Sequence, residues 1–514
     1  MDWTVGYASD IEYTAGFYRE QSPAYLNFVC LLNGYEPIAL DGPFTYCELG
    51  FGRGLTANIL AASNPQGEFY ATDFNPAHVA GARALSTAAQ IPNLHLFENS
   101  FEEMAAGGVP DLPQFDFITL HGIYTWVTAE SRQHVVQFIR RFLKPGGVVY
   151  VSYNAMPGWS TALPLQRLLV EHADLAPGRS DAQMKTAAAF VRQLESAQAG
   201  FFKANPGLKS RLDMLASGNV NYLVHEYLHK HWQPLYFADV ARDLADAKLD
   251  YVGSAELAHA YPALFFTPEK LAIIDGSADH VFRETLKDYF LNTSFRKDVF
   301  VRGPRAMSAL RQKELLQDLE LVALVPRGSA NLRLKLGNAE IDARPEIYNP
   351  VLEALHHGPK SIRELALLPE LKGRPSGTMS QVAALLVVSG QAATCPALPS
   401  TAPGATAQRL NRVLANLARY SDDYQALASP LLGNGVGVGY PERLVYAIVA
   451  DAQGPLDAQH IAEKAWDTMQ ASGRNMAKDG KPIEGRAENL AALRALATTC
   501  LEHRLPLWKT LHML

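Results

Sequence analysis

Apolar side chains recur at helical spacing between residues 17 and 32 of the chain. Ser22 followed by Pro23 is a typical helix start, because serine caps the first turn and proline fits the first helical position. The Asn33-Gly34 pair after the last apolar position is a typical helix end. We therefore predict a helical segment within residues 1–40.

From residue 44 the pattern changes to short apolar strands that alternate with amphipathic helices. The strand candidates are Phe44–Leu49, Glu68–Phe74, Leu94–Glu98, Phe115–His121 and Val148–Tyr153. The helix candidates are Leu55–Ala62, Pro76–Ala89 and Arg132–Leu143, the last ending at Lys144-Pro145-Gly146-Gly147. Such alternation implies βαβ units and a mostly parallel sheet. We predict an α/β domain over residues 41–160.

The alternation stops after the fifth strand candidate. Residues 161–340 are predicted to be mostly helical, with a hairpin near Ala330–Leu336, where apolar and polar residues alternate. Three short helices and a strand predict a winged-helix-like unit over residues 341–396. A linker of proline and small residues, 396–406, precedes a helical domain over residues 407–514.

The length and composition of the chain are typical of a folded protein with several domains. The 514 residues exceed what one hydrophobic core usually covers, and 48% hydrophobic with 19% charged residues is ordinary for globular chains. The net charge of −6 gives no general attraction to nucleic acid. The third helix of the winged-helix-like unit, Thr378–Leu385, lacks the Lys and Arg that read DNA. We expect a packing or protein-docking unit and no nucleic-acid partner.

Nothing in the sequence predicts export or membrane insertion. The Met1–Thr4 start lacks the features of a signal peptide, and no apolar run approaches the ~20 residues of a spanning helix. The four cysteines, Cys30, Cys47, Cys395 and Cys500, form no CxxC pair. We expect buried, reduced thiols and a cytoplasmic location.

A glycine loop, Glu48–Gly54, follows the first strand candidate and opens a helix. Gly50, Gly52 and Gly54 let the backbone approach a ligand closely. The helix start beyond them offers free N–H groups to a carboxylate. Glu48 would repel a pyrophosphate, but it suits a ligand that carries a cationic amine.

Other cofactor loops fit this segment less well. Phosphate loops continue Gly-Lys-Ser/Thr, whereas Leu55 and Thr56 follow here, and the third glycine comes one residue early for a dinucleotide loop. Asp73 at the end of the second strand can accept hydrogen bonds from both ribose hydroxyls, in NAD or in S-adenosylmethionine. The combination predicts S-adenosylmethionine.

These motifs resemble, in order, those of class I S-adenosylmethionine-dependent methyltransferases. The motifs are Glu48–Gly54, Asp73, Asn99–Phe101, Phe115–His121 and Leu143–Gly147. The chain is also similar to bacterial methyltransferases with a so-called regulatory domain, a group that includes protein lysine methyltransferases of rickettsias. That likeness lies in Tyr18–Glu20, His121–Tyr124, Tyr153–Trp159 and His231–Phe237.

The resemblance implies roles for individual residues. Glu48, Gly50, Gly52 and Gly54 would hold the methionine end of the cofactor. Asp73 would bind the ribose with Phe74 beside it, Ser100 and Phe101 would line the adenine, and His121 would lie near the sulfonium. Residues 1–40 would cover the cofactor, and residues 161–340 would be a regulatory or dimerisation region. The rickettsial enzymes act on an outer-membrane protein as dimers, which implies a protein acceptor and a homodimer.

Methyl transfer to lysine needs a neutral amine, which a nearby sulfonium and partial desolvation favour, and aromatic walls can steer the amine and tolerate its methylated cation. We hypothesise that Tyr18, Tyr124 and Tyr153 line the acceptor pocket; alternatively they pack between sheet and helices. His121 is either a general base or a packing residue on the cofactor. Asn154 is assigned an amide contact to substrate or cofactor.

Three alternatives stay open: a small-molecule methyltransferase, a non-catalytic S-adenosylmethionine-binding interaction protein, and a zinc hydrolase. The zinc alternative rests on His225–His229, which matches HExxH, with Glu256 as a third ligand. Pro234 follows closely and the GxxH extension is missing, so we predict no metal site. Accessory domains over more than half the chain favour a large acceptor. The Asn-Pro-Pro-Tyr signature of base methyltransferases is absent after the fourth strand.

Overall fold

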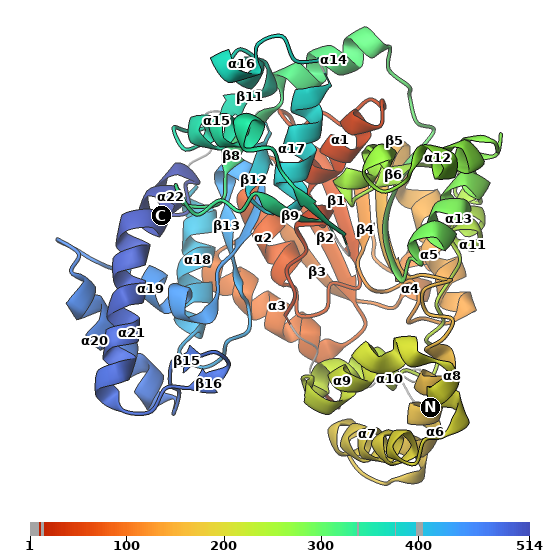
Figure 1. Cartoon of the computed structure of the whole chain (residues 1–514), viewed down its shortest axis with the longest axis horizontal. Coiled ribbons are helices and arrows are strands. Elements are labelled where there is room, and N and C mark those ends of the chain that lie inside the picture. The colour runs from red at the N-terminus through yellow and green to blue at the C-terminus, as the bar shows by residue number, and fades with distance from the viewer. Residues whose placement is uncertain (1–9, 12–14, 337–338, 376, 397–403) are drawn as a thin grey trace.

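The computed structural model describes residues 10–11, 15–336, 339–375, 377–396 and 404–514. Its central strands are β1 (Phe44–Leu49), β2 (Gly67–Asp73), β3 (Leu94–Glu98), β4 (Phe115–Leu120), β5 (Leu143–Asn154), β6 (Leu249–Ser254) and β7 (Phe295–Arg302). They form one sheet in the order β3-β2-β1-β4-β5-β7-β6 (Figure 1). β1 to β5 are parallel, and β7 is antiparallel to both neighbours.

Five helices precede or connect the first five strands; the first three begin where the sequence predicts, the fourth was not predicted, and the fifth begins three residues earlier than predicted. They are α1 (Pro23–Leu32), α2 (Leu55–Ser63), α3 (Pro76–Ala89), α4 (Phe101–Ala106) and α5 (Ala129–Phe142). Ser22 caps α1, because its hydroxyl accepts the Tyr25 N–H at 3.2 Å. Asn75 caps α3 in the same way. The predicted α/β class with a Rossmann-like sheet is therefore confirmed.

Two features of the sheet differ from the prediction. β5 begins directly after α5 and includes Lys144–Gly147, which we expected to be a loop; Gly146 allows this with φ of +80°. β6 and β7 lie beyond residue 160, so the sheet extends past the predicted range 41–160. Arg296, Lys297 and Asp298 interrupt the apolar pattern of β7, and their charges are paired in the interior. This polar content hid the strand.

The order of the strands fixes where a ligand binds. From β1 the chain moves to β2 and β3 on one side of the sheet, whereas β4 and β5 lie on the other side. Connections on opposite sides leave a crevice at the carboxyl ends of β1 and β4, which is the usual ligand site of such sheets. The Glu48–Gly54 loop and His121 emerge at this point.

The residues between β5 and β7 form mostly helices, as predicted. They are α6 (Leu163–Leu175), α7 (Ser180–Ser196), α8 (Gly200–Ala204), α9 (Lys209–Ser217), α10 (Val220–Tyr227), α11 (Phe237–Ala245), α12 (Pro268–Asp275) and α13 (His280–Leu291). Helices α6 to α10 pack around a core of their own that contains Leu169, Leu212 and Trp232. They form a separate lobe below the sheet in Figure 1.

The next segment contains the predicted hairpin and three helices. Its elements are α14 (Ala309–Asp318), β8 (Glu320–Ala323), β9 (Arg333–Leu336), β10 (Ala339–Asp342), α15 (Pro345–Leu355), β11 (Lys360–Ser361), α16 (Ile362–Ala366), α17 (Thr378–Val388) and β12 (Ala392–Cys395). β11, β8 and β12 form a three-stranded sheet, so β8 joins the winged-helix-like unit from outside the predicted residues 341–396. α17 is buried over most of its length and does not offer a free face to a DNA groove.

The C-terminal residues form helices around a hairpin. The elements are α18 (Ala405–Leu417), β13 (Ala426–Ser429), β14 (Asn434–Gly437), α19 (Tyr440–Ala450), α20 (Ala458–Ala471), β15 (Ala477–Lys478), β16 (Lys481–Pro482), α21 (Arg486–Thr499) and α22 (Leu505–Thr510). The glycine run expected to interrupt the helices supplies β14. The domain packs on α2 and α3, where Arg409 donates to the Ala89 carbonyl at 3.0 Å. Residues 397–403 of the predicted linker lie outside the described residues.

All four cysteines are buried and unpaired, as predicted. Within the part of the chain that the structure describes, no helix combines the length and apolarity needed to cross a bilayer.

Candidate active site

A cavity of about 420 Å³ opens at the carboxyl ends of β1 and β4. Nine of the predicted site residues line it: Tyr18, Glu48, Gly50, Gly52, Asp73, Phe74, Ser100, Phe101 and His121. They come from the N-terminal segment and from the ends of the first four strands, so the topology of the sheet brings them together. Gly54, Tyr124, Tyr153 and Asn154 do not line it.

The glycine loop has the backbone that the sequence predicts. Gly50, Gly52 and Gly54 have φ of +77°, +57° and +73°, a region that disfavours side chains. A Cβ on Gly54 would also lie 2.5 Å from the Ala82 Cβ on α3. Gly54 is therefore needed to pack α2 against α3, although it does not itself face the cavity.

Glu48 provides a buried negative group next to this loop. Its side chain is 3% exposed, and Gln21 donates to Oε1 at 3.2 Å. The other oxygen, Oε2, is buried without a hydrogen-bond partner among the described residues. Burial raises the pKa of Glu48 to about 8. An unpartnered carboxylate oxygen on the cavity wall fits a ligand that brings an ammonium group.

Asp73 is fixed in place at the end of β2. Oδ2 accepts the Gly52 N–H at 2.8 Å, and Oδ1 accepts the Asn75 N–H at 2.9 Å. His78 Nδ1 lies 3.2 Å from Oδ1. Each carboxylate oxygen can accept more than one hydrogen bond. Asp73 therefore both holds the glycine loop and keeps acceptor capacity for ribose hydroxyls.

Ser100 has a structural task as well as a place in the cavity wall. Its hydroxyl accepts the Glu103 N–H at 3.2 Å, and Glu103 accepts the Ser100 N–H at 2.8 Å. This capping box starts α4 and sets the position of Phe101, the first residue of the helix. Phe101 then offers an apolar surface to the cavity.

His121 stacks on Tyr18, with ring centroids 3.5 Å apart. The Tyr150 hydroxyl lies 2.8 Å from His121 Nδ1. Burial lowers the pKa of His121 to about 3. Such a weak base is neutral and accepts few protons near pH 7, so the geometry favours the packing alternative for His121 over general-base catalysis.

The C-terminal domain holds the segment that carries Tyr18 and Gln21. Asn434 on β14 donates to the Arg19 carbonyl at 3.0 Å and to the Ser22 hydroxyl at 2.9 Å. The same domain also contacts the glycine loop, where Arg53 pairs with Asp423 at 2.7 Å. The accessory domain therefore supports two walls of the cavity. Residues 1–9 and 12–14 of the predicted cover lie outside the described residues.

Tyr124, Tyr153 and Asn154 do not line this cavity, and the two tyrosines make hydrogen bonds elsewhere. Tyr124 is fully buried and donates to Asp243 Oδ2 on α11 at 3.1 Å. Tyr153 is fully buried and donates to Asp298 Oδ2 at 2.6 Å. β5 continues through Asn154, so Tyr153 and Asn154 lie within the strand, where successive side chains point to opposite faces of the sheet.

We expect Tyr153→Phe to lower stability without affecting the active site. The substitution removes the hydroxyl that Asp298 accepts, which should cost about 1–2 kcal/mol of unfolding free energy. Urea denaturation measures this loss, and calorimetry with S-adenosylhomocysteine should give an affinity within twofold of the wild type. A methyl-transfer rate reduced tenfold at unchanged stability would return Tyr153 to the acceptor pocket.

Residues of the HExxH match line the same cavity, which the sequence did not reveal. His225, Glu226 and His229 reach it from α10 and the loop that follows, together with Tyr222 and Trp126. The motif drew attention to this segment, but it indicated zinc chemistry and not a place beside the cofactor residues. Only the folded chain shows that the two segments share a cavity.

The geometry does not support the zinc alternative. α10 ends at Tyr227, so His225 and His229 do not share the continuous helix on which the motif depends. Glu256, the expected third ligand, pairs with Lys297 at 2.9 Å. Among the described residues, no three His, Cys, Asp or Glu side chains are grouped to hold a metal ion.

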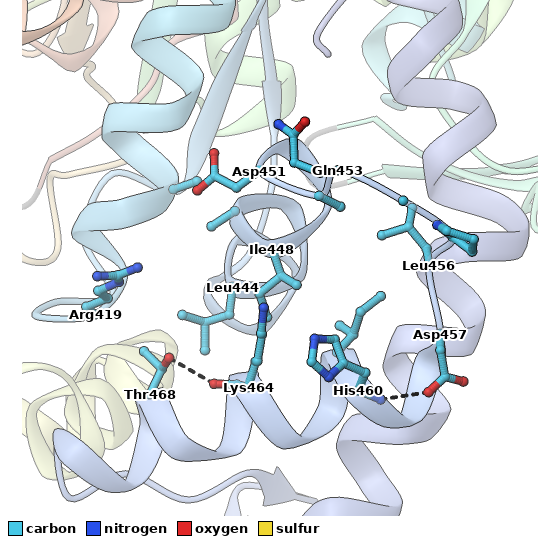
Figure 2. A pocket seen from close by; sticks show the side chains of 16 residues that line it. Arg419, Leu444, Ile448, Asp451, Gln453, Leu456, Asp457, His460, Lys464 and Thr468 are labelled. Atoms are coloured by element: carbon cyan, nitrogen blue, oxygen red, sulfur yellow. Dashed lines mark hydrogen bonds between the residues drawn. The ribbon is translucent and has the colours of Figure 1, made fainter.

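A second cavity, of about 470 Å³, lies in the C-terminal domain between α18, α19 and α20 (Figure 2). Arg419, Asp451 and Lys464 stand at its wall with charges of both signs. Asp457 is engaged as the cap of α20, where it accepts the His460 N–H at 3.0 Å. None of the predicted site residues lines this cavity.

Comparisons with known proteins agree with the first cavity. A family model described as a methyltransferase domain matches residues 47–149, and one described as a predicted methyltransferase regulatory domain matches residues 219–302. The second range includes α10, β6 and β7, so the segment named as regulatory completes the sheet and supplies one wall of the cavity.

Relatives and solved structures extend this likeness to the whole chain. The uncharacterized protein sll1526 from Synechocystis is 37% identical over 511 residues, 99% of both chains. The uncharacterized protein RP789 from Rickettsia prowazekii is 22% identical over 56% of this chain and 51% of its own. The fold matches PKMT2 from Rickettsia typhi, solved in complex with AdoHcy, with a TM-score of 0.68 at 16% identity, covering 96% of this chain and 99% of that one.

The sequence motifs, the strand order and the matched family models thus all indicate a methyltransferase. The predicted S-adenosylmethionine residues gather at one cavity. The chain belongs to the class I S-adenosylmethionine-dependent methyltransferases that carry a methyltransferase regulatory domain.

Proposed function

We propose that this methyltransferase modifies lysine side chains of a protein acceptor. The observation that carries the proposal is the composition of the cavity beyond the cofactor residues. Trp126 and Tyr222 give that wall aromatic surface, and Glu226 gives it a carboxyl group. Aromatic rings and a carboxyl attract an ammonium group, whether or not it is already methylated. The likeness in fold to PKMT2 supports the same substrate class.

The residues around the glycine loop would hold the cofactor in one orientation. Glu48 would pair with its amine, the loop N–H groups at the start of α2 would bind its carboxylate, and Asp73 would accept from its ribose hydroxyls. When bound, S-adenosylmethionine supplies a methyl group on a positively charged sulfur. Placing an acceptor in line with that methyl group can contribute about 7–11 kcal/mol to the barrier reduction.

Tyr18 and His121 would border the space between cofactor and acceptor. Their stacked rings form an apolar surface, and Thr56 holds the Tyr18 backbone by accepting its N–H at 3.1 Å. Such a surface excludes water from the reacting groups. Partial desolvation also lowers the pKa of an amine from its usual ~10.4, which raises the neutral fraction that can react.

Methyl-lysine formation tests the proposal directly. The pure protein is incubated with methyl-labelled S-adenosylmethionine and a cell-envelope extract, and the protein fraction is hydrolysed and analysed for labelled amino acids. We expect label in methyl-lysine. Asp73→Ala is the matched control and should reduce the label to background, because the ribose loses its acceptor.

Other outcomes would point to the alternative functions. Label that appears only in small molecules would replace the protein acceptor with a small-molecule one. No label in any fraction, with S-adenosylhomocysteine still bound in calorimetry, would indicate a non-catalytic binding protein. On the family resemblance we also propose that the protein is a homodimer, and light scattering measures the oligomeric state. On the four unpaired cysteines we propose a cytoplasmic location.

A further inference from the structure

Glu226 brings a second carboxyl group to the cavity, apart from the cofactor residues. It lies near the end of α10, within the segment that matches the regulatory-domain model. Glu48 and Asp73 reach the cavity from the sheet instead. The cofactor accounts for the carboxyl groups of Glu48 and Asp73 but not for that of Glu226.

The charge of Glu226 is not neutralised by a nearby cation. Among the residues that the structure describes, no Lys, Arg or His lies within ion-pair distance of its carboxyl group. Arg211 on α9 is the cation that influences it, but Arg211 stacks 3.5 Å above the Trp159 ring and donates to the Tyr227 hydroxyl at 3.3 Å. Burial, opposed by Arg211 and by a hydrogen bond from Tyr222, raises the pKa of Glu226 to about 7.

Among the histidines that line the cavity, His225 is held by a backbone carbonyl and His229 is a weak base. His225 Nε2 lies 3.0 Å from the Ile11 carbonyl, which requires the proton on that nitrogen for a hydrogen bond. Burial, together with His225 and His231, lowers the pKa of His229 to about 3. His134 and His231 also line the cavity, and His231 is exposed to solvent.

The remaining carboxyl groups are placed differently. Glu102 and Glu130 line the cavity too, but both side chains are exposed. An exposed carboxyl keeps its water shell. His121, the other group considered as a base, is neutral and stacked on Tyr18. Glu226 is thus a partly buried acid in a cavity that the aromatic residues Trp126 and Tyr222 also line.

We propose that Glu226 binds the ammonium group of the incoming acceptor and takes its proton, which makes Glu226 a catalytic base for this enzyme. The inference rests on the proposed function, because it needs an amine acceptor. The carboxylate accepts one proton and becomes a carboxylic acid, while the ammonium becomes a neutral amine. The amine electron pair then forms the new N–CH₃ bond, and the pair of the broken C–S bond stays on sulfur. The proton leaves Glu226 for solvent after product release.

The base strength of Glu226 suits this transfer better than that of an ordinary glutamate. A free glutamate with a pKa of ~4.3 lies about six pKa units below a lysine amine at ~10.4. Because the pKa of Glu226 is raised to about 7, the difference between the carboxyl pKa and the amine pKa falls to roughly half. Desolvation of the amine lowers its pKa and narrows the gap further. Closely matched pKa values make general-base catalysis efficient.

Glu226→Gln tests the proposal, with Glu130→Gln as the matched control on the same cavity. We expect Glu226→Gln to lower the rate of methyl-lysine formation about a hundredfold at pH 7.5. S-adenosylhomocysteine affinity should stay within twofold in calorimetry. The variant should recover towards wild-type rates at pH 9–10, where solvent deprotonates the amine. Glu226→Asp should keep part of the activity, and Glu130→Gln nearly all of it.

The outcomes separate this inference from the proposed function. Wild-type rates and an unchanged pH profile in Glu226→Gln would overturn the inference, while methyl-lysine would still support the function. If the wild type forms no methyl-lysine, the proposed function fails. The ammonium-binding role of Glu226 is then tested separately, by n-butylamine binding to the S-adenosylhomocysteine complex. Butylamine that binds the wild type at pH 8 but not Glu226→Gln supports an ammonium site. Equal binding, or none by either protein, overturns it.

Discussion

Glu48→Gln is expected to stabilise the cofactor-free protein above pH 8 and to weaken S-adenosylhomocysteine binding at least thirtyfold. The two effects have one cause. Glu48 is a buried carboxyl with an unpartnered oxygen, so its negative charge is costly until a cationic ligand arrives. Losing one partner of a buried charge pair typically costs 2–5 kcal/mol of binding energy, or roughly thirtyfold to several-thousandfold in Kd.

The pH dependence of stability follows from the raised pKa. Burial holds the pKa of Glu48 near 8 in the folded protein, against an ordinary value of 4.5. Below pH 4.5 the carboxyl is protonated in both states and has no effect. As pH rises from 4.5 to 8 the unfolded chain ionises first, so the folded state loses stability, by up to roughly 4–5 kcal/mol above pH 8. Glutamine does not ionise and escapes this loss.

Calorimetry and urea denaturation across pH 5–9 measure both effects. Wild-type affinity for S-adenosylhomocysteine should increase up to about pH 8, as Glu48 ionises, whereas Glu48→Gln should show a flat profile over that range. Glu102→Gln, an exposed carboxyl of the same cavity, is the control and should match the wild type. Unchanged affinity in Glu48→Gln would mean that this carboxyl does not meet the ligand amine.

The half of the sheet that carries the cofactor site could be predicted because its signals are local. β1 to β4 are short apolar runs followed by glycine or polar residues, and α3, α4 and α5 begin with side-chain caps. The glycine loop and Asp73 lie within 30 residues of each other. In a parallel sheet, strand order alone then brings their ends together.

The other half depends on contacts between distant segments. β7 pairs with β5 across more than a hundred intervening residues, and with β6 across a shorter helical segment. The charged residues of β7 make its sequence look like an exposed segment, because several of the groups that neutralise them lie on other elements. Tyr153 looked like a pocket residue for a similar reason: its partner, Asp298, is distant in the chain. Glu226 and the aromatic residues beside it could not be placed near the cofactor before the fold was known.

The accessory segments consequently help to build the cavity. The segment that matches the regulatory-domain model contributes two strands and the wall that holds Glu226. The C-terminal domain fixes the backbone around Tyr18 and pairs with Arg53 of the glycine loop. A conformational change in either segment would therefore alter the shape of the cavity directly.

Arg296→Leu is expected to lower the unfolding free energy by about 3–5 kcal/mol, because it strands a group of buried acids. Arg296 is 7% exposed and donates to Asp298 at 2.8 Å, to Asp288 at 2.7 Å and to Glu284 at 3.1 Å. Its guanidinium also lies 4.3 Å from the centre of the Phe237 ring, which joins β7 to α11. Leucine fills some of this volume but neutralises no charge.

Arg242→Leu is the matched control for this substitution. Its partner Asp239 and Arg242 itself are largely exposed, so the loss should stay below about 1 kcal/mol. Urea denaturation measures the unfolding free energy of both variants. Adding Asp288→Asn to Arg296→Leu should restore part of the stability, since one unpaired charge disappears. If Arg296→Leu were as stable as the wild type, or if the second substitution deepened the loss, the buried acids would not be what Arg296 holds in place.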